Sequence, residues 1–246
     1  MTTFTTAPGR PVAYGYTIGM LCAEWNIPFV PGDLNNATTF DFPVRYLTVD
    51  GAVGADVLSG NALHYAEHFV VAAKRLEAEG VRAITGNCGY MGAYQQVVAD
   101  AVSIPVFLSS LLQAPLLLSM LASTADLGVL VANADGISEA LLSGAGISDV
   151  SRLQFKGLND KPHFHDVILR ETGTLDVERL TTEVVEGALA LVEENPRVRA
   201  ILLECSDLPP YAAAVHGATG LPVFDWAGFI RFVHDAVAPR TYTGRY

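Results

Sequence analysis

Two of the three cysteines in this chain occupy matching positions of an internal repeat. Residues 81–107 align without a gap with residues 198–224, at an offset of 117 positions, and 11 of the 27 aligned residues are identical. Cys88 falls on Cys205 in this alignment. If the two halves pack around a two-fold axis, the two thiols can face each other across one cleft. That geometry suits moving a proton from one face of a carbon atom to the other.

Each of these cysteines follows an apolar run that predicts a strand and precedes a predicted helix. Ligands bind at this carboxyl edge of open parallel sheets. Beside the first cysteine, Asn87, Gly89 and Tyr90 are candidate substrate-binding residues, because glycine lets backbone N–H groups approach an anion closely. Ser206 and Asp207 are the candidates beside the second. A position near a helix N-terminus is expected to favour the thiolate and to lower the cysteine pKa toward neutrality.

Three further polar residues are expected on the same rim, because each follows another predicted strand. Asn35 lies in the long loop after the first strand, Ser109 follows the fourth strand and Asn133 follows the fifth. Loop residues at this edge often contact ligands, although they also serve as ordinary turns and caps. Cys22 has no counterpart in the second half and is predicted to lie in the core.

The amino-acid composition and net charge limit the kinds of function that this chain is expected to have. The chain has 246 residues, half of them apolar, and a net charge of -11. The negative charge disfavours nucleic acid or an anionic membrane as a partner and leaves a small molecule as the expected ligand. No signal peptide or membrane-spanning run is recognised, and three unpaired cysteines are typical of free thiols, so a cytoplasmic location is expected. Phosphate-binding and dinucleotide-binding glycine motifs are missing from the sequence.

Short apolar runs alternate with helical periodicity along both halves, which predicts an α/β fold. We expect two similar lobes, each a short parallel sheet flanked by helices, related by a pseudo-two-fold with a cleft between them. The first lobe is expected to comprise residues 1–112 plus 226–246, and the second residues 113–225. The expected helices span residues 55–80, 93–102, 176–195 and 227–237.

A strand ending in GNCG in one half and in LECS in the other resembles the aspartate/glutamate/hydantoin racemase superfamily, which also includes arylmalonate decarboxylase-like members. The resemblance covers residues 17–237 and rests on the paired cysteines and the two-lobe repeat. It implies cofactor-independent chemistry, a possible homodimer, and Cys88 and Cys205 as the acid/base pair.

The residues around the cysteines depart from those of the amino-acid racemases. Such racemases commonly carry Asn-Thr after the first cysteine and Thr-His after the second, where this chain has Gly89-Tyr90 and Ser206-Asp207. Glutamate and aspartate are therefore not the expected substrates.

The expected function is a cofactor-independent racemase or epimerase, an isomerase, acting on a small carboxylate or carbonyl compound such as an amino acid or hydantoin. Two alternatives stay open at this stage: an arylmalonate-type decarboxylase that uses one cysteine, and a ligand-binding protein without turnover. A metal site through His163 and His165 is not expected, because further ligands are not evident nearby.

Overall fold

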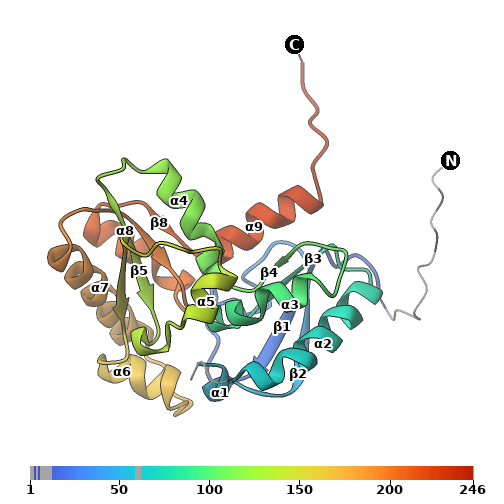
Figure 1. Ribbon diagram of the computed structural model, residues 1–246, viewed down its shortest axis with the longest axis horizontal. Coiled ribbons are helices and arrows are strands. Elements are labelled where there is room, and N and C mark those ends of the chain that lie inside the picture. The colour runs from blue at the N-terminus through green and yellow to red at the C-terminus, as the bar shows by residue number, and fades with distance from the viewer. Residues whose placement is uncertain (1–2, 4, 6–12, 59–61, 246) are drawn as a thin grey trace.

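The computed structural model describes residues 3, 5, 13–58 and 62–245. They form two lobes, each built on a parallel four-stranded sheet with helices packed against it (Figure 1). The sheet orders, β2-β1-β3-β4 and β6-β5-β7-β8, are the same in both lobes. The α/β prediction is confirmed. The strands are β1 (Ile18–Glu24), β2 (Val44–Val53), β3 (Ala83–Gly86), β4 (Val106–Phe107), β5 (Asp126–Val131), β6 (Leu153–Gly157), β7 (Val198–Leu203) and β8 (Val223–Phe224).

The sequence repeat is also a repeat of strand register. Ile84 on β3 pairs with Gly19 on the central strand β1. Ile201 on β7, 117 positions later, pairs with Gly128 on the central strand β5. The strands that lead to the two cysteines therefore occupy equivalent places in their sheets. Their carboxyl ends lie at the equivalent edge of each lobe.

A glycine on each central strand lets a long helix pack closely on its sheet. A Cβ added to Gly19 would lie 2.9 Å from the side chain of Leu76 on α2 (Ala66–Ala78). A Cβ added to Gly128 would lie 2.8 Å from Leu191 on α7 (Val177–Glu194). Both leucines are fully buried, so the same small-to-large packing builds the core of each lobe.

The helix predicted over residues 55–80 is divided. The structure has α1 over Gly54–Leu58, a 3-10 turn η1 over Ala62–Tyr65, and α2 over Ala66–Ala78. Part of the predicted helix, residues 59–61, lies outside the described residues. Apolar spacing alone did not reveal the change of helix type.

The helix predicted after Cys88 is shorter and begins differently. A 3-10 segment, η2 (Gly89–Tyr94), follows the cysteine, and α3 covers only Gln95–Ala99. The two longer helices predicted in the second half of the sequence, α7 and α9 (Trp226–Val237), are confirmed within one residue at each end.

The remaining elements are short and surround the second sheet or join the lobes. The chain crosses between lobes through η3 (Ser110–Gln113) and α4 (Ala114–Met120), and α9 returns to pack on β1 and β3 of the first lobe (Figure 1). The others are η4 (Ala134–Gly136), α5 (Glu139–Gly144), α6 (Pro162–Phe164), the π-helical turn η5 (His165–Leu169), η6 (Pro209–Tyr211) and α8 (Ala212–Thr219). Within the described ranges, every helix is too short or too polar to cross a bilayer.

Candidate active site

The two cysteines of the repeat share one electrostatic environment at the carboxyl ends of β3 and β7. Cys88 directly precedes η2, and Cys205 lies two residues beyond the end of β7. The side chains are nearly buried, with 5 % of Cys88 and 7 % of Cys205 exposed. Glu204 and Asp207 each act electrostatically on both thiols. The same two carboxyl groups therefore influence both thiols.

Neither thiol is held as a thiolate in this closed site. Burial, followed by the charge of Glu204, raises the pKa of Cys88, although the backbone N–H groups of Tyr90 and Met91 oppose the shift. Burial also raises the pKa of Cys205. The expected fall toward neutrality is wrong because short 3-10 segments follow the cysteines, and desolvation and carboxyl groups outweigh their N–H groups.

Cys205 has a proton acceptor within reach. Its Sγ donates a hydrogen bond to Asp207 Oδ2 at 3.2 Å. Asp207 also accepts hydrogen bonds from the hydroxyl of Ser206 and from the carboxyl of Asp33. The charge of Asp207 and this hydrogen bond both help to raise the pKa of Cys205, so the thiol keeps its proton in the substrate-free site, with Asp207 as its hydrogen-bonded acceptor.

Asp33 and Asp207 form a carboxyl pair that joins the lobes. Burial, the charge of Asp207 and the hydrogen bond to Asp207 raise the pKa of Asp33, so Asp33 carries the proton of the pair. Asp33 is buried in the loop between β1 and β2, and Asn35 in the same loop donates its backbone N–H to Asp33 Oδ1 at 2.7 Å. The sequence analysis missed Asp33 because its Pro-Gly-Asp-Leu-Asn setting is typical of an ordinary turn.

Glu204 is the second group that the sequence analysis missed. Its side chain is 0 % exposed, and neither carboxyl oxygen has a hydrogen-bond partner in the described part of the chain. Burial raises its pKa to about 8. The carboxyl lies against Gly89 of the other lobe, where an added Cβ would be 1.6 Å from Glu204 Oε1. An acidic residue closing the apolar strand VRAILL, just before a cysteine, was the available signal.

Tyr90 lies beside both thiols and ties its loop to the second lobe. Its hydroxyl donates to the carbonyl oxygen of Asn133 and accepts from the Asn133 backbone N–H at 3.1 Å. Burial raises the pKa of Tyr90, and Glu204, Cys88 and Cys205 add to the shift. The phenol is therefore neutral at the site.

Two predicted binding residues use their side chains within the fold. The Asn87 amide donates from Nδ2 to the carbonyl oxygen of Ala23 at 3.1 Å and accepts the Ala23 N–H at Oδ1 at 2.9 Å. Ser109 is fully buried, and its hydroxyl accepts the backbone N–H of Leu111. Both residues support the shape of the site and leave substrate contact to other groups.

The remaining predicted residues lie around the two loops. Ser206 is buried, and its carbonyl oxygen accepts a long hydrogen bond from the backbone N–H of Leu34 at 3.4 Å, which brings the loop between β1 and β2 against the second cysteine loop. The Asn133 side chain caps η4 by accepting from the backbone N–H of Asp135. Cys22 is packed in the core, as predicted, and burial raises its pKa to about 12.

The charged side chains that act on this site are all negative. The ionised groups that shift the pKa values of the two thiols, Asp33 and Asp207 are carboxylates, and no Lys, Arg or His acts on them in the described ranges. Within those ranges there is also no group of three residues suited to hold a metal ion. A site of this kind attracts a ligand that carries a positive charge.

The fold matches solved structures of the superfamily that the sequence resembles. An unliganded arylmalonate decarboxylase superposes with a TM-score of 0.58 at 19% identity, covering 94% of this chain and 95% of that chain. Allantoin racemase from Pseudomonas fluorescens superposes with a TM-score of 0.56 at 15% identity, covering 90% of both chains. These likenesses confirm the fold that the resemblance to the aspartate/glutamate/hydantoin racemase superfamily predicted.

The curated relatives carry a different activity in their names. A dimethylsulfoniopropionate lyase from Durusdinium sp. clade D is 30% identical over 225 residues, covering 89% of this chain and 74% of the relative. The chain belongs to the dimethylsulfoniopropionate lyase family. Dimethylsulfoniopropionate lyase 5 from Emiliania huxleyi is 32% identical, again over 89% of this chain, but the chain spans only 45% of that relative. No protein-family model matches the sequence.

These relatives correct one prediction. The expected isomerase activity is wrong, because the members of the dimethylsulfoniopropionate lyase family that match this chain are lyases. The racemases share its fold at 15% identity or less. The fold was predicted correctly from the sequence, the type of reaction was not, and the catalytic role of the paired thiols stays a prediction.

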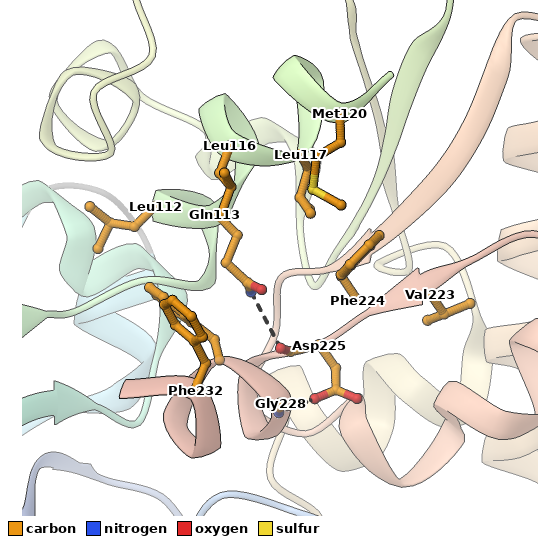
Figure 2. Close-up of a pocket in the computed structure, with 11 residues that line it drawn as sticks. Leu112, Gln113, Leu116, Leu117, Met120, Val223, Phe224, Asp225, Gly228 and Phe232 are labelled. Carbon is orange, nitrogen blue, oxygen red and sulfur yellow. Dashed lines mark hydrogen bonds between the residues drawn. The ribbon is translucent and has the colours of Figure 1, made fainter. Parts of the chain in front are cut away.

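A hollow of about 350 Å³ lies between α4 and α9 in this member of the dimethylsulfoniopropionate lyase family (Figure 2). It contains neither cysteine, and its lining is largely apolar, with Leu116, Leu117 and Phe232 among the residues that border it. Gln113 Nε2 donates to the carbonyl oxygen of Asp225 at 3.3 Å, and the Asp225 side chain caps α9. Because its polar groups are occupied in this way, the hollow offers no acid/base chemistry.

Proposed function

We propose that this chain cleaves a carbon–sulfur bond in dimethylsulfoniopropionate, or in a closely related sulfonium carboxylate, by β-elimination. The observation that carries the proposal is the pair of thiols in a site whose other charged groups are all acidic. Such a site favours a substrate with a cationic end and disfavours a dianionic malonate. The names of the family relatives support the same substrate.

The proposed reaction needs one strong base and no cofactor. In dimethylsulfoniopropionate the sulfonium is attached to the carbon β to the carboxylate. A thiolate removes a proton from the α-carbon, the C–H electrons form the new C=C bond, and the C–S bond breaks with its electron pair left on sulfur. The products are neutral dimethyl sulfide, acrylate and a protonated thiol, so atoms and charge balance.

We assign the base to Cys205 and a supporting role to Cys88. Cys205 passes its own proton to Asp207 once the substrate is bound, the substrate proton then restores the Cys205 thiol, and the Asp33–Asp207 pair releases the first proton to solvent. Cys88 presents an S–H group to the negative charge that develops on the substrate carboxylate as the α-proton leaves. Because both thiols are nearly buried, the lobes must separate to admit the substrate.

The test is the release of product from dimethylsulfoniopropionate by the purified chain. Dimethyl sulfide is measured in the headspace by gas chromatography, and acrylate is measured in solution by NMR. The expected result is equimolar release of both products by the parent protein and by Cys22→Ala, which changes a cysteine outside the site. Release no faster than that of Cys205→Ser would refute the proposed function.

A further inference from the structure

The Glu204 carboxyl group is buried and forms no hydrogen bond within the described residues. The backbone N–H of Glu204 donates to the Leu130 carbonyl oxygen at 2.9 Å. Both side-chain oxygens, however, are buried and have no hydrogen-bond partner among the described residues. Proteins rarely leave a buried polar group unpaired, because desolvation without a hydrogen-bond partner is unfavourable. A group of this kind is explained when a ligand supplies the missing partner.

The surroundings of Glu204 indicate which partner is missing. Burial is the cause of its raised pKa, and no cationic side chain in the described ranges opposes it. The carboxyl lies against Gly89 and is close enough to influence Cys88, Cys205 and Tyr90. A cation bound at Glu204 would therefore lie beside both thiols, within the proposed site.

We propose that Glu204 is the specificity-determining residue that binds the sulfonium end of the substrate. The identity of the cation rests on the proposed function, whereas the binding of a small onium ion rests on the geometry of Glu204 alone. A sulfonium has no N–H or O–H group to donate, so its recognition depends on charge and contact. Two carboxylate oxygens without hydrogen-bond partners in the described part of the chain, close enough to act electrostatically on Tyr90, suit such an ion.

Binding of the cation also prepares the base. Glu204 holds a proton in the substrate-free site, and an adjacent positive charge favours its release. The sulfonium charge then acts on both thiols and favours their ionised forms, against the desolvation that raises their pKa values. The thiolate thus forms when a cationic substrate is present, and a neutral compound of the same shape does not produce it.

Equilibrium binding in the Cys205→Ser background tests this assignment without turnover. The two ligands are dimethylsulfoniopropionate and 4-methylpentanoate, which replaces the sulfonium by a neutral C–H group of similar shape. We expect the sulfonium ligand to bind about 10- to 100-fold tighter by calorimetry. Adding Glu204→Gln should abolish that preference, and adding Glu194→Gln, a surface control, should leave it unchanged.

A second measurement needs no change at Glu204. Affinity for dimethylsulfoniopropionate in the Cys205→Ser protein should rise as pH increases through about 8, where the Glu204 carboxylate forms, and affinity for 4-methylpentanoate should not rise. A sulfonium preference that is retained in Glu204→Gln, or that is independent of pH, overturns the assignment.

The outcomes separate this assignment from the proposed function. If the parent protein cleaves dimethylsulfoniopropionate while Glu204→Gln keeps the sulfonium preference, the function stands and the Glu204 assignment falls. If the parent protein releases no dimethyl sulfide but binds trimethylsulfonium ion in a manner that requires Glu204, the assignment stands and the proposed reaction falls.

Discussion

The two cysteine loops occupy equivalent places in the fold and differ in chemistry. The first loop, GNCGYMG, surrounds Cys88 with glycines and with backbone N–H groups, two of which act on its sulfur. The second loop, LECSDLPP, surrounds Cys205 with the carboxyl groups of Glu204 and Asp207. One loop supplies hydrogen-bond donors and the other supplies proton acceptors and negative charge.

This difference suits a reaction that runs in one direction. A racemase that uses two thiols needs each of them to serve as base for one enantiomer and as acid for the other. Among the described residues, Cys205 has a carboxylate at hydrogen-bond distance to accept its proton and Cys88 has none. An elimination needs one base and a route by which the abstracted proton leaves, and Asp207 with Asp33 provides that route in the proposed mechanism.

The largest expected effect separates the two thiols. Cys205→Ser should lower kcat by about 1,000-fold or more, because an alcohol is a far weaker acid than a thiol and forms no useful base. Cys88→Ser keeps a hydrogen-bond donor and should lower kcat by only about 10- to 100-fold. Dimethyl sulfide release under saturating substrate measures both. Equal losses would show that the loops act alike and would remove the asymmetry argued above.

A smaller effect is expected when the proton acceptor of the second loop is removed. Asp207→Asn should lower kcat by about 100-fold, since Cys205 must then lose its proton without a neighbouring base. Activity of this variant should keep rising with pH above 8, as hydroxide takes over the role. Asp166→Asn serves as the matched control in the same pH series, because Asp166 is an exposed carboxylate that belongs to neither cysteine loop. An unchanged pH profile in Asp207→Asn would contradict the role of Asp207.

Some features of the two cysteine loops could be predicted from the sequence, and others could not. The repeat located both thiols, and the strand register of Ile84 and Ile201 confirms that their strands are equivalent. The parallel sheet of each lobe could be predicted because it depends on the alternation of apolar runs and helical periodicity in each half. Asp33 and Glu204 were missed because their chemistry arises only when the lobes meet: Asp33 becomes half of a pair through Asp207, and Glu204 becomes buried against Gly89.

The type of reaction could not be predicted from the sequence either. Two thiols on a duplicated fold are compatible with racemisation, decarboxylation and elimination. The single sign of charge around them, which disfavours anionic substrates, depends on side chains from three loops. The net charge of the whole chain says nothing about that local field.

The acid of the second loop should also affect stability. The folded-state pKa of Glu204 is about 8, above its usual 4.5, so the folded protein keeps a proton that the unfolded chain has lost between these values. Stability is therefore expected to fall as pH rises through this window, by at most about 1.4 kcal/mol per pH unit from this group. Glu204→Gln should flatten the fall. Urea unfolding between pH 5 and 8 measures it, and parallel curves for parent and variant would argue against a buried, protonated Glu204.

The smallest expected effect concerns the donor-rich first loop and its attachment to the second lobe. Tyr90→Phe removes the hydroxyl that bonds to the backbone of Asn133 and leaves a half-buried carbonyl oxygen and N–H without that partner. The expected loss is about 1–3 kcal/mol in the free energy of unfolding. Glu204 is unchanged in this variant, so the preference for a sulfonium ligand over its neutral counterpart should persist. Urea unfolding and ligand binding on the same variant test the two statements separately. A stable Tyr90→Phe protein that has lost the preference would move cation recognition from the acidic loop to the Tyr90 hydroxyl, and so reverse the roles assigned to the two loops.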